Sequence, residues 1–273
     1  MIQGLIEATE IVMPKLKIAI VGDTGIGKSW LACSVADDNN IVYDLDFDGR
    51  AASLRGKKNV FVKSYVDKDP DMPSAMADLE SDIITWEYEH DKGELNNVTF
   101  VIDSGTFMVT AIEREAIRQE PSNGKPIIRL PGGTKQRPRA LKIGTGYDWA
   151  KINREYFLNI CGRLSQLGNL VVTFIDRDER DRTQTDDKGK PVVSYTGKIT
   201  VEPQHVAPVL ATFNDVWYLH GEGGYRSLTV GLSRDFNIGK NTFGLEGEIY
   251  GDEMNIRKFI QRVTPNGSEA VAK

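Results

Sequence analysis

Residues 22–29 match the pattern G-x-x-x-x-G-K-[ST] and lie between an apolar run, 16–21, and a predicted helix, 28–36. Glycines in such a loop turn backbone N–H groups toward phosphates, and the N-terminus of the next helix attracts the same anions. Lys28 is predicted to reach the β- and γ-phosphates of a nucleotide, and Ser29 to bind Mg²⁺. The alternative is a glycine-rich turn without a ligand. The predicted phosphate-binding residues are Gly22, Asp23, Thr24, Gly25, Ile26, Gly27, Lys28 and Ser29.

A second candidate is Asp103, which ends the apolar run 98–103. An acid at the end of such a strand orients Mg²⁺ directly or through a bound water. Acidic strand ends are common, so Asp103 is informative only together with the loop at 22–29. We therefore expect Asp103 and Ser29 to share the metal.

Hydrolysis of a bound triphosphate also needs a group that orients or deprotonates the attacking water. The apolar run 41–46 ends in acids, with Asp44 and Asp46 inside it and Asp48 directly after it. Asp46 is the predicted catalytic carboxylate, with Lys28 and Asp103 beside it. Alternatively, all three acids are solvated loop carboxylates, or Asp48 and Gly49 only form a turn.

The elements that must position these residues alternate between short apolar strands and amphipathic helices. This order predicts an α/β fold with a mainly parallel central sheet, helices on both faces and a β extension near the C-terminus. The expected strands are 16–21, 41–46, 59–62, 98–103, 169–175, 215–219 and 225–232, and the expected helices are 28–36, 73–90, 107–119, 149–167 and 254–263.

Length and composition predict one core domain over 15–263, with an N-terminal extension, 1–14, and a flexible tail, 264–273; two small domains are the alternative. Hydrophobic residues make up 40% and charged residues 27% of the 273 residues. No apolar run approaches the ~18 residues that span a bilayer. The first residues also lack a basic segment followed by an apolar stretch, so we expect no membrane association and a cytoplasmic location.

A basic stretch lies between the predicted helices 107–119 and 149–167. Segment 121–147 contains cations and no acid, although the net charge of the whole chain is −5. It is expected to be a flexible loop beside the phosphate site that binds the backbone of single-stranded DNA. A solvated loop without a ligand and an arginine-bearing kinase lid are the alternatives. The predicted DNA-binding residues are Lys135, Arg137, Arg139 and Lys142.

With these segments in place, the chain resembles the RecA-like P-loop ATPase core, and specifically phage Sak4-like single-strand annealing ATPases and related phage nucleotide-binding proteins. The resemblance covers roughly 15–245, and only the segments around 22–29 and 98–103 are specific. It implies ATP and Mg²⁺ as ligands, and recombination or annealing of single-stranded DNA in the host cytoplasm. It also implies self-association into a ring or filament, with a single-strand-binding protein as a further candidate partner.

The resemblance also assigns roles to single residues. Asp46 falls where the relatives carry their catalytic carboxylate, which is often Glu. The relatives' polar sensor falls at Asp176 or Arg177, where a Gln-like residue is more usual. Arg234 and Lys240 fall where related ATPases place cations that reach a neighbour's γ-phosphate, and surface cations are the alternative.

Other functions compatible with the same loop are a small-molecule kinase and a catalytically silent nucleotide-binding protein. A switch GTPase is disfavoured because Asp103-Ser104-Gly105 does not have the D-x-x-G spacing, and 174–177 lacks the guanine-recognition pattern.

Overall fold

The structure is a computed structural model. It describes residues 15–69, 72–118, 121–122, 125–134, 137–142, 146–185, 191–199, 209–222, 225–230, 242–245 and 247–263. The predicted extension 1–14, the tail 264–273, and the candidates Lys135, Arg234 and Lys240 lie outside these ranges.

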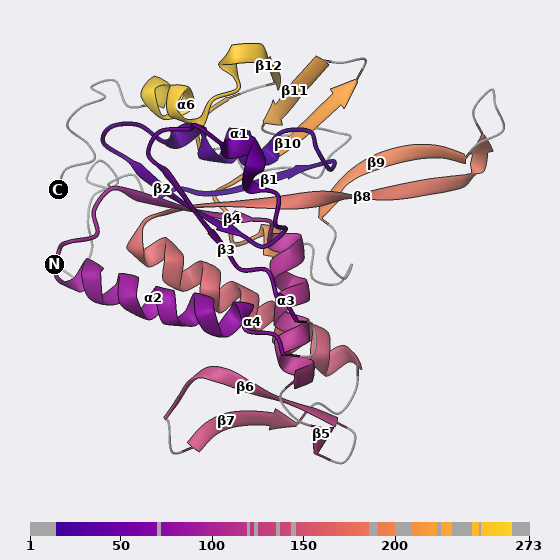
Figure 1. Ribbon diagram of the computed structural model, residues 1–273. Helices are drawn as coiled ribbons and strands as arrows, with labels where there is room; N and C mark the ends of the chain where they lie inside the picture. The colour runs from indigo at the N-terminus through magenta and orange to yellow at the C-terminus, as the bar shows by residue number, and fades with distance from the viewer. Residues whose placement is uncertain are drawn as a thin grey trace, which may run out of the picture.

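A mostly parallel sheet forms the centre of the molecule (Figure 1), in the order β12-β11-β10-β1-β8-β4-β2-β3. Neighbours from β10 to β3 run parallel, whereas β11, β12 and β9 pair antiparallel. The predicted α/β fold with a C-terminal β extension is therefore confirmed. The strands are β1 (Lys17–Gly22), β2 (Ile41–Asp46), β3 (Val60–Ser64), β4 (Val98–Asp103), β8 (Asn169–Thr185), β9 (Pro191–Ile199), β10 (Asp215–Glu222), β11 (Tyr225–Val230) and β12 (Gly247–Tyr250).

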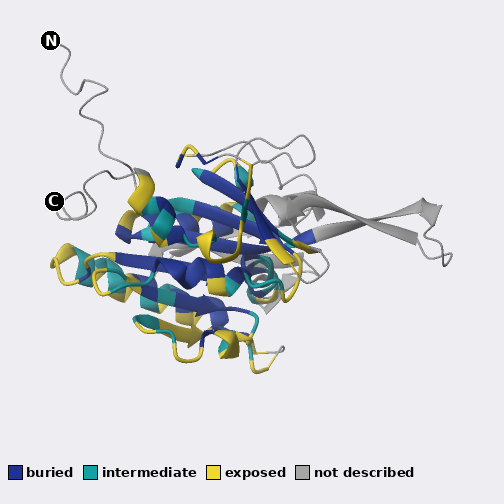
Figure 2. Cartoon of the chain, turned by 90° about the horizontal axis from the view of Figure 1, so that it is seen from above, coloured by how far each residue is buried: buried dark blue, intermediate teal, exposed yellow. Residues whose placement is uncertain are grey.

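Helices cover both faces of this sheet, as Figure 1 shows. One face packs against α1 (Lys28–Ala32) and α6 (Ile256–Val263), and the other against α2 (Ala75–Asp91), α3 (Gly105–Arg118) and α4 (Gly146–Leu167). Apolar residues that alternate along β1, β2, β4, β8 and β10 contribute to the two resulting core layers. The inner strands are accordingly buried along most of their length (Figure 2). Within the described residues, no helix is long and apolar enough to cross a membrane.

Strand register brings the candidate residues to one edge of the sheet. Asp46 pairs in register with Asp103, and both end their strands. Gly22 ends the parallel strand β1 and is paired with Ile175 of β8 on one side and Leu219 of β10 on the other. The carboxyl ends of parallel strands form the edge at which open α/β sheets bind their ligands.

The expectation of a loop over 121–147 is wrong in the described part. This segment contains β5 (Pro121–Ser122), β6 (Lys125–Thr134) and β7 (Arg137–Lys142), which form a small antiparallel sheet. Its Pro131-Gly132-Gly133 run coincides with a register shift between Leu130 and Thr134, so these residues form an irregularity within a strand pair. β8 continues to Thr185 instead of ending at 175 as expected, and its far part pairs antiparallel with β9.

Candidate phosphate-binding site

The loop between β1 and α1 needs glycine at both of its ends. Gly27 has a φ of 104°, which lies in the left-handed region that glycine adopts at little cost. At Gly22, an added Cβ would lie 2.3 Å from the carbonyl oxygen of Leu219 on β10. The glycines of the motif thus let the loop turn and let it approach β10 closely.

Lys28 folds back across this loop. Its Nζ donates hydrogen bonds to the carbonyl oxygens of Gly22, at 3.0 Å, and Asp23, at 2.7 Å, and the residue is only 8% exposed. Desolvation lowers the pKa of Lys28, and the negative charges of Asp103 and Asp23 oppose that shift. A polyanion bound in the loop would stabilise the charged form of Lys28, which burial disfavours.

Asp103 lies beside the start of α1 and is held by two hydroxyl groups. Thr173 Oγ1 on β8 donates to Asp103 Oδ1 at 2.6 Å, and the Ser29 side chain also hydrogen-bonds this carboxylate. Burial raises the pKa of Asp103, while the bonds from Ser29 and Thr173 favour its ionised form. The predicted pair of Ser29 and Asp103 is therefore in contact.

Asp46 is buried next to Asp103 but is partly engaged by its own loop. Its Oδ1 accepts the backbone N–H groups of Asp48, at 3.1 Å, and Gly49, at 2.8 Å. Desolvation raises the pKa of Asp46, and the Gly49 bond lowers it. Asp44 and Asp46 are therefore not solvated loop carboxylates, whereas the alternative of a turn at Asp48 and Gly49 is present and is held by Asp46.

Asp44 is fully buried on the same face of β2. Neither of its carboxylate oxygens has a hydrogen-bond partner among the described residues. Desolvation, reinforced by the charges of Asp103, Asp46 and Asp48, raises the pKa of Asp44 to about 8. A carboxyl group in this state is protonated at neutral pH and is poorly suited to accept a proton from water.

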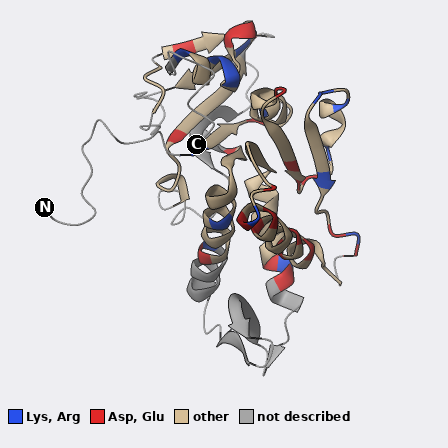
Figure 3. Cartoon of the chain, turned by 90° about the vertical axis from the view of Figure 1, so that its left-hand side faces the viewer, with Lys and Arg blue, Asp and Glu red and all other residues tan. Residues whose placement is uncertain are grey.

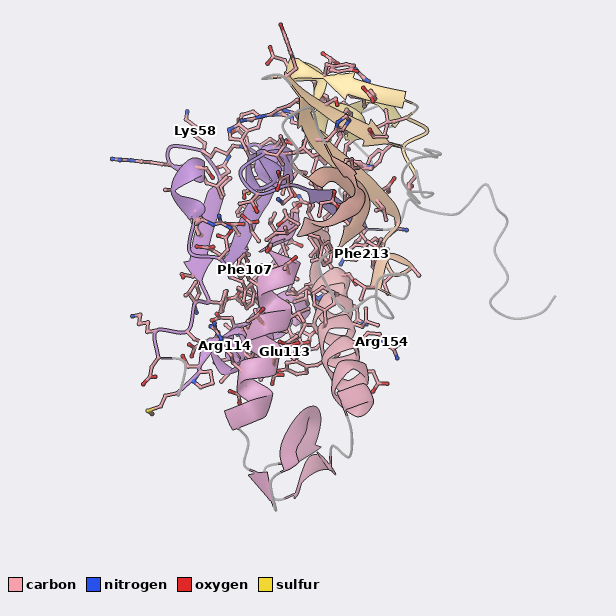
Figure 4. The ribbon with its side chains drawn as sticks, turned by 90° about the vertical axis from the view of Figure 1, so that its right-hand side faces the viewer. Lys58, Phe107, Glu113, Arg114, Arg154 and Phe213 are labelled. Atoms are coloured by element: carbon pink, nitrogen blue, oxygen red, sulfur yellow. The ribbon has the colours of Figure 1, made fainter. Side chains whose placement is uncertain are left out.

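The structure adds residues that the sequence analysis did not identify. Thr173 cannot be recognised as a site residue from the sequence, because a β-branched residue is common in an apolar strand. Arg50 forms an ion pair of 2.9 Å with Asp48, and its guanidinium lies 5.9 Å from the ring centre of Phe107. Figure 4 shows Phe107 at the sheet end of α3, with Glu113 and Arg114 farther along that helix. Only the register between β4 and β8, and the turn after β2, reveal these positions.

The remaining candidates lie away from the loop or outside the described residues. Arg137, Arg139 and Lys142 belong to β7, in the small sheet at the end of α3 remote from the central sheet (Figure 1). The 14 residues of α3 span about 21 Å. The basic segment is therefore not beside the phosphate loop. On the face shown in Figure 3, the cations and acids of the described residues are intermingled.

Asp176, one of the two sensor positions implied by the resemblance, faces the other side of the sheet from Thr173. Its Oδ2 accepts a hydrogen bond of 2.6 Å from the hydroxyl of Tyr218, and Tyr218 belongs to the core layer formed with α2, α3 and α4. The side chain of Arg177 lies outside the described residues.

Within the described part of the chain, no group of at least three His, Cys, Asp or Glu side chains is arranged to hold a metal ion. Ser29 and Asp103 would thus hold Mg²⁺ only together with oxygens of a bound phosphate. Comparison with protein-family models gave no match, and a search of curated proteins found none with significant similarity.

Proposed function

We propose that this protein is a RecA-like P-loop ATPase that binds Mg·ATP at 22–29 and acts on single-stranded DNA in recombination or strand annealing. One observation carries the proposal. Lys28, Ser29 and Asp103 gather where β1, β4 and α1 meet, at the carboxyl edge of a mostly parallel sheet. Neutral backbone donors, a lysine and a hydroxyl–carboxylate pair in that place suit a magnesium-bound triphosphate.

In the proposed site, Lys28 exchanges its bonds to the carbonyls of Gly22 and Asp23 for oxygens of the β- and γ-phosphates. Ser29 and Asp103 would hold a Mg²⁺ ion, which would supply positive charge to the phosphate oxygens during cleavage. Thr173 fixes the orientation of Asp103 through its hydrogen bond. A bound triphosphate would thus meet a buried cation and a buried carboxylate, and interactions between charges are stronger away from bulk water.

Hydrolysis requires an attacking water, and Asp46 is the proposed group that orients it. Oδ1 of Asp46 accepts two backbone N–H groups, and the carboxyl group also hydrogen-bonds the Asp48 side chain, so an attacking water would take the place of Asp48. Attack on the γ-phosphorus breaks its bond to the β–γ bridging oxygen and releases ADP and phosphate. The raised pKa of Asp46 makes this carboxylate a stronger base than an exposed aspartate.

A route between nucleotide and DNA follows from α3. This helix begins at Gly105, directly after Asp103 and Ser104. β6, in the small sheet of β5, β6 and β7, lies against the same helix. In the proposal, occupancy of the phosphate site shifts α3, and α3 changes how β6 and β7 present their cations. Self-association into a ring or filament would repeat this arrangement along a DNA strand.

A binding protein that does not hydrolyse ATP is the second candidate. It is favoured by the hydrogen bonds that Asp46 already makes, to the backbone of Asp48 and Gly49 and to the Asp48 side chain. A steady-state ATPase assay with and without single-stranded DNA separates the two candidates. The proposal expects turnover that DNA increases and that Lys28→Ala abolishes. No turnover in either condition, with Mg·ATP still bound, would favour the silent binder.

A further inference from the structure

A cation that the sequence analysis did not consider lies against the phosphate loop. Arg226 belongs to β11, close to 200 residues along the chain from the loop, yet a Cβ built on Gly27 would lie 2.9 Å from its Nη1 and 3.5 Å from its Cζ. The guanidinium therefore touches the glycine that directly precedes Lys28.

Packing between the loop and the β10–β11 hairpin positions the strand that carries Arg226. A Cβ on Gly221 of β10 would lie 2.5 Å from Cδ1 of Ile26, so Ile26 occupies the space that Gly221 leaves free. Gly221 is paired in register with Arg226. The contact between Ile26 and Gly221 thus holds the hairpin, and with it Arg226, against the loop.

Arg226 is exposed, and no carboxylate among the described residues forms an ion pair with it. Asp46 and Asp103 belong to β2 and β4, and β8 and β1 separate these strands from β10. A cation that lies against a phosphate loop and has no acidic partner among the described residues is suited to an anionic ligand.

We infer that Arg226 binds the α-phosphate end of the nucleotide that occupies this loop. The inference rests on the proposed function. Ser29 and Asp103 mark the side of the loop where Mg²⁺ and the β- and γ-phosphates are expected. Because a triphosphate is a linear chain, its other end leaves toward the opposite flank, where β10 and β11 carry Arg226. Arg226 therefore contributes equally to ATP and ADP affinity and takes no part in cleavage.

Calorimetric titrations of the full chain with Mg·ATP and Mg·ADP test this inference. Arg226→Gln, which removes the charge, is expected to weaken both nucleotides by a similar factor of roughly 10 to 100. Arg226→Lys, which keeps a cation, should retain most of the affinity. Arg257→Gln is the matched control, because it removes the same charge far from the loop. Arg257 forms an ion pair of 3.2 Å with Asp37, which precedes β2 and therefore lies at the amino ends of the strands.

The outcomes are distinct. If the parent binds Mg·ATP, three results would each overturn the role of Arg226. They are unchanged affinities in Arg226→Gln, a loss of affinity for ATP alone in that variant, or an equal loss of affinity in Arg226→Lys. Failure of the parent protein to bind either nucleotide would overturn the proposed function, and this inference with it.

Discussion

Thr173 on β8 donates a hydrogen bond of 2.6 Å to Oδ1 of Asp103 on β4, and both groups are almost completely buried. The bond crosses between adjacent parallel strands and fixes the carboxylate that also contacts Ser29. An acid held in this way needs no rearrangement when a metal ion arrives, which is the usual purpose of such supporting hydrogen bonds.

Thr173→Val should lower the apparent affinity for Mg²⁺ in the presence of ATP, because valine has the same shape as threonine but cannot donate a hydrogen bond to Asp103. The expected loss is about 10- to 100-fold in apparent Mg²⁺ affinity, measured by titrating Mg²⁺ at fixed ATP. Thr173→Ser should restore it. Thr99→Val is the control. Thr99 is also buried and donates a hydrogen bond to Asn40, but it lies at the start of β4, at the other end of the strand from Asp103. Equal losses in Thr99→Val and Thr173→Val would show only a general packing effect.

Asp46→Asn is expected to keep Mg·ATP binding and to lose hydrolysis, because an amide cannot accept the proton of the attacking water. Asp44→Asn should leave turnover close to that of the parent, since the Asp44 carboxyl group is already protonated at neutral pH. Phosphate release by both variants at saturating ATP measures the contrast. The assignment fails if Asp46→Asn turns over at the parent rate, and it moves to Asp44 if that variant is the inactive one.

Asp44 also predicts how stability depends on pH. Its pKa is raised to about 8 in the folded chain and is about 4 when unfolded, so folding favours the protonated form. The stabilisation is complete below about pH 4 and is lost as pH rises through about 8. Asp44→Asn, which is always neutral, should therefore gain stability relative to the parent between pH 5 and pH 9, by about 4 kcal/mol. Urea unfolding at both pH values measures this, and a constant difference between the two proteins would refute it.

Replacement of Lys135, Arg137, Arg139 and Lys142 by Ala should weaken binding to single-stranded DNA without changing ATP affinity. Each phosphate contact contributes about 0.7 to the slope of log affinity against log salt, so the slope should fall by up to roughly 3. Fluorescence anisotropy of a labelled oligonucleotide over a salt series gives the slope. Arg55, Lys58, Lys68 and Lys92, all exposed, provide a control with the same loss of charge. If the control and the test variant have equal slopes, the basic segment is not the DNA site.

Local patterns predicted much of this architecture. The strands that end at Asp46 and Asp103 have the predicted bounds, because a continuous apolar run that stops at an acid leaves little ambiguity. The loop at 22–29 was equally clear. In contrast, Thr173 and Arg226 lie near the loop only because of which strands pair with which. The order of strands in a sheet is a long-range property that no local pattern encodes. The Pro- and Gly-rich segment around 131–133 has the sequence pattern of a loop, because these residues interrupt the pattern of a strand, yet they do not prevent β6 from pairing with β7.

The most direct test of the central claim is a calorimetric titration of Lys28→Ala with Mg·ATP. Lys57→Ala is the matched control, because Lys57 Nζ also donates to a carbonyl of α1, that of Trp30 at 2.8 Å, but lies outside the loop. We expect the parent and Lys57→Ala to bind with similar affinity, and Lys28→Ala to show no measurable binding while keeping its circular dichroism spectrum. Unchanged ATP affinity in folded Lys28→Ala would contradict the assignment of the phosphate site.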